Sequence, residues 1–556
     1  MPDTWDTPLS ADEVHLLAPF VTNLDRPIFG LRNLPEVVKG ALFSRYSRSD
    51  KSLRRILLDE FITAPEAGFA PVADIGLTDE REQMVATQQA ESFYERVLIG
   101  YGDDSVAELG GAHVACESIS NIAAKALEDS RIGINPLEKS TRYVAFDRQV
   151  DGCYRYYRPA ELMASPHAMR YVASMDRLFA TYSALMEPVL TYVRERTPRE
   201  ADTSLRAYNS ATRARALDLL RGLLPMATLT NVGLYGNGRA FEYLLTKLAA
   251  APQQELRELG QALQRELDQL IPAFVKRART ERGAAYARYM AANRSHVAIL
   301  AHTLLPTPQP APVPAVQLLE FDPDAELKTV AAILYPHTDL PLNQVQAHVT
   351  TLSPAERQRI ITAFVGERGS RFHRPGRAFE EPYYTFDLLA DLGVYRDLQR
   401  HRMLTQERQP YGVHHGYVTP PDLVACGVAE TFNAALEQAA ATVTAIQADL
   451  PEIAPYAVPF AFRVRWRIKL NLREAYHLLE LRSARQGHPG YRAIAQEMYR
   501  QISAVHPALA AGMRFVDLQD YALERLAAEQ RLDTKLHDRG QFDATADDAG
   551  LDGSGR

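Results

Sequence analysis

A run of alternating prolines near the middle of the chain limits how the chain can fold. Proline occupies every second position from Pro306 to Pro314. Such a segment favours an extended spacer and excludes both a helix and a central strand. A chain of 556 residues is also too long for one ordinary core. We therefore predict a first domain over 1–305, a linker over 306–314, a second domain over 315–525, and an acidic, disordered tail over 526–556.

The composition is that of a soluble globular protein, with 46% hydrophobic and 24% charged residues and a net charge of −7. This charge argues against a general nucleic-acid binder, although it allows a local basic pocket. The three cysteines lie far apart and form no CxxC pair, which fits a reducing compartment. No leader peptide is visible, and no stretch approaches the ~18 apolar residues of a membrane span. We expect a cytoplasmic protein with no membrane or nucleic-acid partner.

Apolar residues at three- and four-residue steps predict long helices over 174–196 and 255–278. Strand candidates are short and cover 142–146, 152–159 and 458–466. Because both halves are helix-rich and their strand candidates are short, we predict an α+β domain that is repeated.

Two pairs of landmarks suggest that the two halves are copies. Glu380 precedes Arg400 by 20 residues, and Glu108 precedes Glu128 by the same distance. Later in each half an asparagine, Asn237 or Asn471, is followed by an arginine two residues on and by a Leu-Leu pair that begins seven residues on. The matching order indicates a tandem duplication.

The triplet Arg400-His401-Arg402, predicted on a helix, is the strongest candidate for a ligand site. A guanidinium group is planar, permanently charged and rich in donors, so it suits phosphates and anionic rings. The alternative is an exposed basic helix face. Glu474-x-x-His477 has the spacing of a di-iron helix but no second copy, and His414-His415 has no acidic partner nearby. We predict no metal site.

At these residues the chain resembles the flavin-dependent thymidylate synthases. In the second half, RPGRAFEEPYYTFDLLADLGVYRDLQRHRM is similar to the strand and RHR helix of that family, and NLREAYHLLELR is similar to its later helix. In the first half, DDSVAELGGAHV and EKSTRY resemble the corresponding strand and the Ser-x-Arg loop. The resemblance implies two tandem domains, each a small, mainly antiparallel sheet packed with long helices.

Each half departs from the family pattern at a different place. In the second half Pro410 and Gly412 replace the serine and arginine of the loop after RHR. The first half keeps Ser140 and Arg142 but has no RHR, whether the triplet is placed at 128–130 or at 130–132. Leu248 also stands where the second half has Arg482.

The resemblance implies methylation of dUMP to dTMP, with FAD as the flavin and with methylenetetrahydrofolate and NADPH as co-substrates. By analogy we assign the flavin to Arg400, His401, Arg402, Asn471 and His477. We assign the nucleotide to Glu138, Ser140, Arg142, Arg465 and Arg482, and Arg482 is also the candidate catalytic residue. Arg463, Arg465 and Arg467 alternate and could point the same way from a strand, or they could be an unpaired basic row on a sheet edge.

Because each half keeps what the other has lost, we expect a composite site between the two copies. The chain would then form a homodimer that matches the tetramer of the family. The alternative is a non-catalytic descendant that binds flavin or nucleotide, or that serves as a structural partner.

Overall fold

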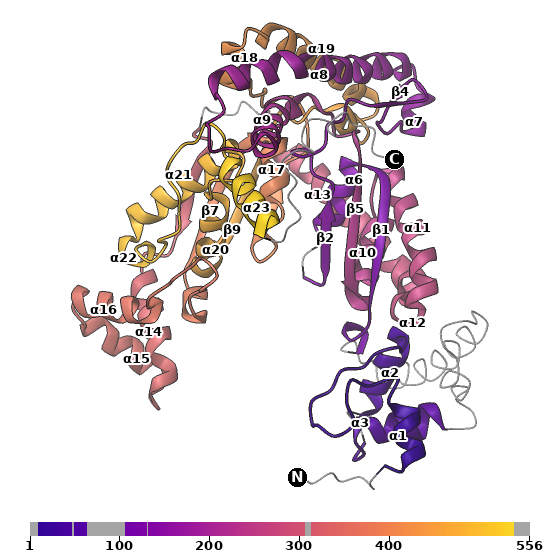
Figure 1. The fold of residues 1–556 in the computed structure, drawn as a ribbon, viewed down its shortest axis with the longest axis vertical. Coiled ribbons are helices and arrows are strands. Elements are labelled where there is room, and N and C mark those ends of the chain that lie inside the picture. The colour runs from indigo at the N-terminus through magenta and orange to yellow at the C-terminus, as the bar shows by residue number, and fades with distance from the viewer. Residues whose placement is uncertain (1–8, 47–48, 64–105, 131, 306–312, 539–556) are drawn as a thin grey trace. The chain divides into compact units, whose positions relative to one another are not determined.

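The computed structural model describes residues 9–46, 49–63, 106–130, 132–305 and 313–538, which form two compact units (Figure 1). Unit 1 comprises Met1–Ser118, Ala126–Glu138 and Asn231–Pro308, and unit 2 comprises Ile119–Lys125, Lys139–Thr230 and Gln309–Arg556. Residues 139–230 of the first half thus belong to the same unit as the whole second half. Most of the expected proline linker, residues 306–312, lies outside the described residues.

Unit 1 is built on a three-stranded sheet with the order β1-β5-β2, in which β2 and β5 are antiparallel. After β5 the chain forms α10, which packs against α11 and α13 (Figure 1). The elements are α1 (Ala11–Leu17), α2 (Glu36–Tyr46), α3 (Leu53–Ile56), β1 (Gly111–Ser120), β2 (Ile134–Glu138), β5 (Leu229–Asn237), α10 (Gly238–Ala249), α11 (Gln254–Leu270), α12 (Pro272–Val275) and α13 (Glu281–Leu304), with α6 (Asn121–Glu128) shared between the units.

The helix that the sequence predicts over 255–278 is interrupted. α11 ends at Leu270, Ile271 leaves the helical conformation, and Pro272 begins α12. The proline ring disfavours a helical residue before it, which explains the break.

Unit 2 holds a four-stranded sheet with the order β6-β7-β9-β8, in which each neighbouring pair is antiparallel. Long helices pack with it. The elements before the sheet are β3 (Gln149–Val150), β4 (Cys153–Tyr154), α7 (Ala160–Met163), α8 (Ala168–Arg196) and α9 (Leu205–Leu220). The rest are β6 (Val316–Phe321), α14 (Ala325–Leu334), α15 (Leu342–Thr351), α16 (Pro354–Val365), β7 (Tyr383–Asp391), α17 (Leu392–Leu398), β8 (Thr405–Arg408), α18 (Pro421–Ala425), α19 (Ala429–Asp449), β9 (Arg463–Asn471), α20 (Leu472–Arg482), α21 (Pro489–Val505), α22 (Pro507–Ala510) and α23 (Leu526–Asp538).

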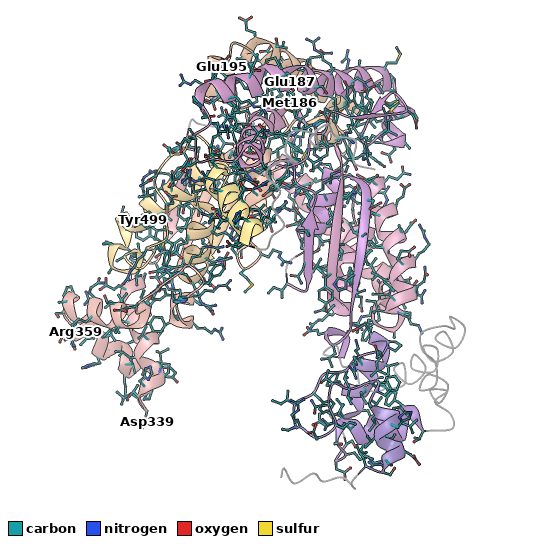
Figure 2. The ribbon with its side chains drawn as sticks, viewed as in Figure 1. Met186, Glu187, Glu195, Asp339, Arg359 and Tyr499 are labelled. Carbon is teal, nitrogen blue, oxygen red and sulfur yellow. The ribbon has the colours of Figure 1, made fainter. Side chains whose placement is uncertain are left out.

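The predicted helix over 174–196 is confirmed as part of α8, which lies beside α19 (Figure 1). Its buried stripe includes Met186, whereas Glu187 and Glu195 on the same helix are exposed (Figure 2). Of the strand candidates, 142–146 forms no strand, 152–159 contains only the short β4, and 458–466 becomes a strand only from Arg463.

The two copies are visible in the structure as matching strand–helix pairs. β5 and β9 have the same length and the same sequence of buried and exposed positions. Each strand leads into a helix that is capped by an asparagine, because the Asn237 side chain accepts from the Ala240 N–H and the Asn471 side chain accepts from the Glu474 N–H, both at 2.8 Å. The α+β fold in tandem copies is confirmed.

The segment after residue 525 is not entirely without structure. Residues 526–538 form α23, and Arg206 of α9 binds it through Glu529 at 3.1 Å and Asp533 at 2.5 Å. This part of the expected tail packs because its acidic side chains find a cationic partner. Residues 539–556 lie outside the described residues. Among the described helices, none has the length and apolar content needed to cross a lipid bilayer.

Candidate functional site

The cationic triplet Arg400-His401-Arg402 lies just beyond a helix and not within one. α17 ends at Leu398, and the His401 N–H donates to the Leu398 carbonyl at 3.1 Å in a closing turn. The prediction of a helical triplet is therefore wrong. Cationic groups at this place are stabilised by the negative end of the helix dipole. Arg400 is exposed, His401 is buried and Arg402 is intermediate.

A small cavity in unit 2 brings the loop that contains Ser140 next to Arg400. We call it the arginine cavity, and it is lined by Lys139, Ser140, Thr141, Arg142, Arg221, Gly393, Arg396, Asp397 and Arg400. Its volume is about 30 Å³, which leaves room for one small polar group and not for a whole nucleotide. The loop comes from the first half of the sequence and Arg400 from the second.

Arg142 is held in place by a buried carboxylate. Its Nε donates to Asp218 Oδ1 at 2.8 Å and its Nη2 donates to Asp218 Oδ2 at 2.7 Å. The two side chains are only 11% and 3% exposed. The Arg142 backbone N–H also donates to Ser140 Oγ at 3.2 Å. Arg142 therefore fixes the shape of the loop, and the Ser140 hydroxyl keeps its own proton available for a ligand.

Sequence reasoning missed Arg221, which is central to this cavity. Its side chain is buried, Nη1 lies 3.3 Å from Asp397 Oδ2, and Nη2 makes no hydrogen bond to any residue that the structure describes. A Cβ atom at Gly393 would lie 3.0 Å from Arg221 Nε, so a larger residue there would press on the guanidinium. The sequence signal was the Arg-Gly-Leu-Leu-Pro segment that starts at Arg221, shortly before β5.

The electrostatic balance of the arginine cavity favours an anion. Burial by itself would raise the pKa of Asp397, but the charges of Arg221, Arg400 and Arg482 lower this pKa well below its usual range. Asp397 is therefore ionised and offsets one positive charge. Since Lys139, Arg396 and Arg400 also line the cavity, its net charge stays positive, which suits a phosphate group.

His401 links two residues of α20. Arg482 Nε donates to His401 Nε2 at 2.8 Å, and His401 Nδ1 lies 2.9 Å from Glu474 Oε1. Because an arginine Nε can only donate, His401 Nε2 must be an acceptor and the ring proton must be on Nδ1. Burial, reinforced by the Arg482 charge, keeps the pKa of His401 far below its usual value, so the ring stays neutral. Both ring nitrogens are therefore engaged by protein groups.

The same geometry bears on metal binding. The ligand atoms of His401, Glu474 and His477 lie within 4.8 Å of one another. A metal ion on His401 Nδ1 would displace the proton to Nε2, where it would face the Arg482 donor. This arrangement fits a hydrogen-bonded chain, Glu474–His401–Arg482, better than a metal centre.

Three residues that the sequence assigned to the ligand site, Asn471, Arg465 and Glu138, do not line the arginine cavity. The Asn471 side chain caps α20, as described above, and so serves the fold. Arg465 Nη1 pairs with Asp387 at 2.6 Å on the face of β9 that also carries Arg463 and Arg467, and it does not line the arginine cavity. Glu138 is the buried last residue of β2 in unit 1.

The helix caps show which residues of the first half correspond to Arg400-His401-Arg402 of the second half. The Ala123 N–H donates to Ser120 Oγ at 3.1 Å, and the Val394 N–H donates to Asp391 Oδ1 at 2.9 Å. Aligning Ser120 with Asp391 places Asp129, Ser130 and position 131 opposite the triplet. This alignment, at 129–131, lies between the two alignments that the sequence left open, 128–130 and 130–132. It requires one extra residue before the helix in the first copy, and the positive φ of Ser118, 55°, shows where the backbone accommodates it. Position 131 lies outside the described residues.

A second basic region surrounds His477. Burial lowers the pKa of His477, Glu474 opposes this shift, and the charges of Arg374 and Arg371 lower the pKa further. Arg374 is exposed and Arg371 is intermediate. The positive charge of these groups suits an anionic ligand.

His488 gives the stability of the protein a dependence on pH. Its Nδ1 accepts from the Gly490 N–H at 3.1 Å and caps α21. Burial, with a contribution from Arg221, lowers the pKa of His488 to about 3.

We expect the free energy of unfolding to fall as the pH decreases from about 6.5 toward 3. Over this range the unfolded chain binds a proton at His488 and the folded chain does not, which costs up to about 1.4 kcal/mol per pH unit. His488→Asn keeps a capping side chain and should reduce this slope. Urea unfolding of the unmodified protein and of His488→Asn at about pH 7 and about pH 5.5 measures the change in the free energy of unfolding with pH. An equal change in the two proteins would contradict the expectation.

The fold and the site describe an α+β protein with duplicated strand–helix units and an arginine-rich cavity for an anion. A family profile described as "Thymidylate synthase complementing protein" matches residues 63–273 and 317–508. The chain therefore belongs to this family, the flavin-dependent thymidylate synthases, in a tandem-duplicated form. This membership supports a thymidylate synthase-like role, that is, a nucleotide methyltransferase-like enzyme.

Relatives of similar length are known. The chain is 43% identical over 517 residues to a UPF0159 protein of Chlamydia pneumoniae, covering 93% of this chain and 96% of the relative. It is 34% identical over 523 residues to a UPF0159 protein of Thermoplasma acidophilum, covering 89% and 99%. A crystal structure of the UMP/dUMP methylase PolB from Streptomyces cacaoi, bound with 5-Br dUMP, is 16% identical, with a TM-score of 0.28 over 35% of this chain and 93% of that chain.

Proposed function

We propose that the protein is an FAD-dependent thymidylate synthase that converts dUMP to dTMP, with methylenetetrahydrofolate as carbon donor and NADPH as reductant. The observation that carries this proposal is the arginine cavity, in which Ser140 and Arg142 from one half of the sequence lie with Arg400 from the other. Each half alone lacks part of the family pattern, and unit 2 contains both remaining parts.

In this proposal the arginine cavity holds the phosphate end of dUMP. Arg221 and Arg400 supply charge, the Ser140 hydroxyl donates a hydrogen bond, and Arg142 fixes the loop through Asp218. The rest of the nucleotide lies outside this small space. Asp397 offsets one of the positive charges that line the cavity.

Arg402 and His477, with the nearby Arg371 and Arg374, are the residues that would hold the flavin. Their positive charge suits the anionic reduced ring. When bound, the flavin supplies the hydride that turns the transferred methylene into a methyl group. His401 contributes by orienting Arg482, since both of its ring nitrogens already have protein partners.

A binding measurement on the full chain tests the nucleotide part of this proposal. We expect dUMP to bind in titration calorimetry, and Ser140→Ala to weaken binding about tenfold through the loss of a hydrogen bond to a charged group. Thr191→Ala, an exposed change on α8, is the control and should leave binding unchanged. No dUMP binding by the unmodified chain would end the proposal.

The alternative function is a nucleotide-binding descendant without catalysis. It is favoured by one observation, the bidentate pairing of Arg142 with Asp218, which leaves this arginine little capacity for a ligand. An assay for dTMP formation with FAD, NADPH and methylenetetrahydrofolate separates the two. If dUMP binds and no dTMP forms, the alternative holds.

A further inference from the structure

A C-terminal segment of unit 2 reaches from α9 to residues 139–144, the Ser140 loop. We call residues 523–538 the C-terminal strap, which consists of a short turn followed by α23 (Figure 1). α23 packs against α9, and the ion pairs of Arg206 with Glu529 and Asp533 fix it there. The strap lies outside both segments that the family profile matches. The family pattern therefore assigns it no role.

Arg525 is the residue of the strap that meets the Ser140 loop. The Cζ atom of its guanidinium lies 3.8 Å from the centroid of the Tyr143 ring. A cation at this distance is attracted by the negative face of an aromatic ring. The Arg525 side chain is 11% exposed, and its Nη2 donates to Glu529 Oε1 at 3.3 Å. The Arg525 carbonyl accepts from the Ala528 and Glu529 N–H groups in the first turn of α23, so the backbone of the residue is held as well.

Tyr143 belongs to the turn that sets the position of Ser140. The Tyr143 and Val144 N–H groups donate to the Ser140 carbonyl at 3.4 and 3.2 Å. Tyr143 is 59% exposed, so the packing of the core does not hold its ring in place. Arg142, the residue before it, binds Asp218 of α9. The loop is therefore anchored twice, to α9 through Arg142 and to the strap through Tyr143.

A further ion pair fixes the turn of the strap beside this loop. Glu524, which precedes Arg525, has a side chain that is only 4% exposed and binds Arg215 of α9 at 2.8 Å. Arg215 lies three residues before Asp218, and residues at this spacing are neighbours on one face of a helix. The same stretch of α9 thus holds the turn of the strap and the Ser140 loop.

We infer that Arg525 is a positioning residue, which holds the Tyr143 ring and thereby fixes the Ser140 hydroxyl at the arginine cavity. Without Arg525 the turn after Ser140 loses one of its two anchors, and the loop must be ordered when an anion binds, which weakens binding. The ordering of the loop depends only on the strap. Its effect on nucleotide binding rests on the proposed function.

Hydrogen–deuterium exchange of the ligand-free full chain tests the ordering of the loop. In Arg525→Leu we expect the Tyr143 and Val144 amides to exchange about fivefold faster, because one cation–aromatic contact is lost. Arg525→Lys keeps a cation over the ring and should restore most of the protection. Arg531→Leu removes an exposed arginine of the same helix and should leave the loop unchanged. Exchange in α9 should be the same in all these proteins, which separates a local effect from general unfolding.

A double-variant cycle and a binding measurement complete the test. Arg525→Leu should weaken dUMP binding about fivefold in titration calorimetry, but it should have little further effect in Tyr143→Leu, which already lacks the ring. If the unmodified protein does not bind dUMP, the proposed function fails and the exchange of the loop decides this inference alone. Unchanged loop exchange in Arg525→Leu, dUMP binding that this variant leaves unchanged, or additive effects of the Arg525 and Tyr143 changes would overturn the inference.

Discussion

Arg142→Ala is expected to lower the free energy of unfolding by about 3–5 kcal/mol, the usual cost of leaving one partner of a buried ion pair without the other. Asp218 is 3% exposed, and two guanidinium nitrogens bind its oxygens at 2.7 and 2.8 Å. Without Arg142 this carboxylate would be buried without its counter-charge. Urea unfolding followed by the fluorescence of Trp466, which is buried in the sheet of unit 2, measures the loss.

Two controls separate this cost from a general effect of removing arginine. Arg142→Met combined with Asp218→Leu replaces the pair by apolar side chains and should recover most of the lost stability. Arg288→Ala removes an exposed partner of Glu281, whose side chain is 81% exposed, and should cost less than about 1 kcal/mol. A stability of Arg142→Ala within about 1 kcal/mol of the unmodified protein would contradict the assigned role.

This expectation changes the role that the sequence suggested for Arg142. A Ser-x-Arg loop predicts that both side chains reach a phosphate, and the structure does place both at the arginine cavity. Asp218, however, comes from α9, far from the loop in sequence. No local spacing could have indicated that this carboxylate engages the guanidinium. The ligand roles of Ser140 and Arg400 stay predictions.

Local pattern predicted the elements well where one physical cause dominated. The periodic apolar stripe of α8 and the alternation in β9 appear in the structure because each element buries one side. The spacing after Asn237 and Asn471 revealed the duplication. From the sequence, Asn471 was interpreted as a ligand contact and Asn237 was not. In the structure each of the two side chains caps the helix that follows it.

Long-range contacts account for what the sequence did not show. Arg221 and Asp397 are 176 residues apart, and neither belongs to the RHR or Ser-x-Arg motif. Arg482 and His401 were assigned separately to nucleotide and flavin, whereas the structure joins them by a hydrogen bond. Spacing gives the face of a helix on which a residue lies, but not the partner that another element brings to it.

The hydrogen-bonded residues Glu474, His401 and Arg482 are the basis of the second prediction with a large effect. Glu474→Leu is expected to weaken dUMP binding by about 2 kcal/mol, or roughly thirtyfold, because it leaves the buried His401 Nδ1–H without an acceptor and so releases the ring that orients Arg482, the residue assigned to the nucleotide. Glu474→Gln keeps an oxygen acceptor and should restore most of the affinity. Glu497→Leu, a change on the exposed side of α21, is the matched control.

Affinity alone would not distinguish positioning from a simple loss of packing, so the tautomer of His401 supplies the decisive measurement. Nitrogen NMR of histidine-labelled protein should show a neutral ring with the proton on Nδ1 in the unmodified protein and in Glu474→Gln, because Arg482 Nε must donate to Nε2. In Glu474→Leu this signal should be lost or averaged. A proton on Nε2 in the unmodified protein, or tight stoichiometric binding of zinc by His401, Glu474 and His477, would mean that Arg482 is not oriented through His401.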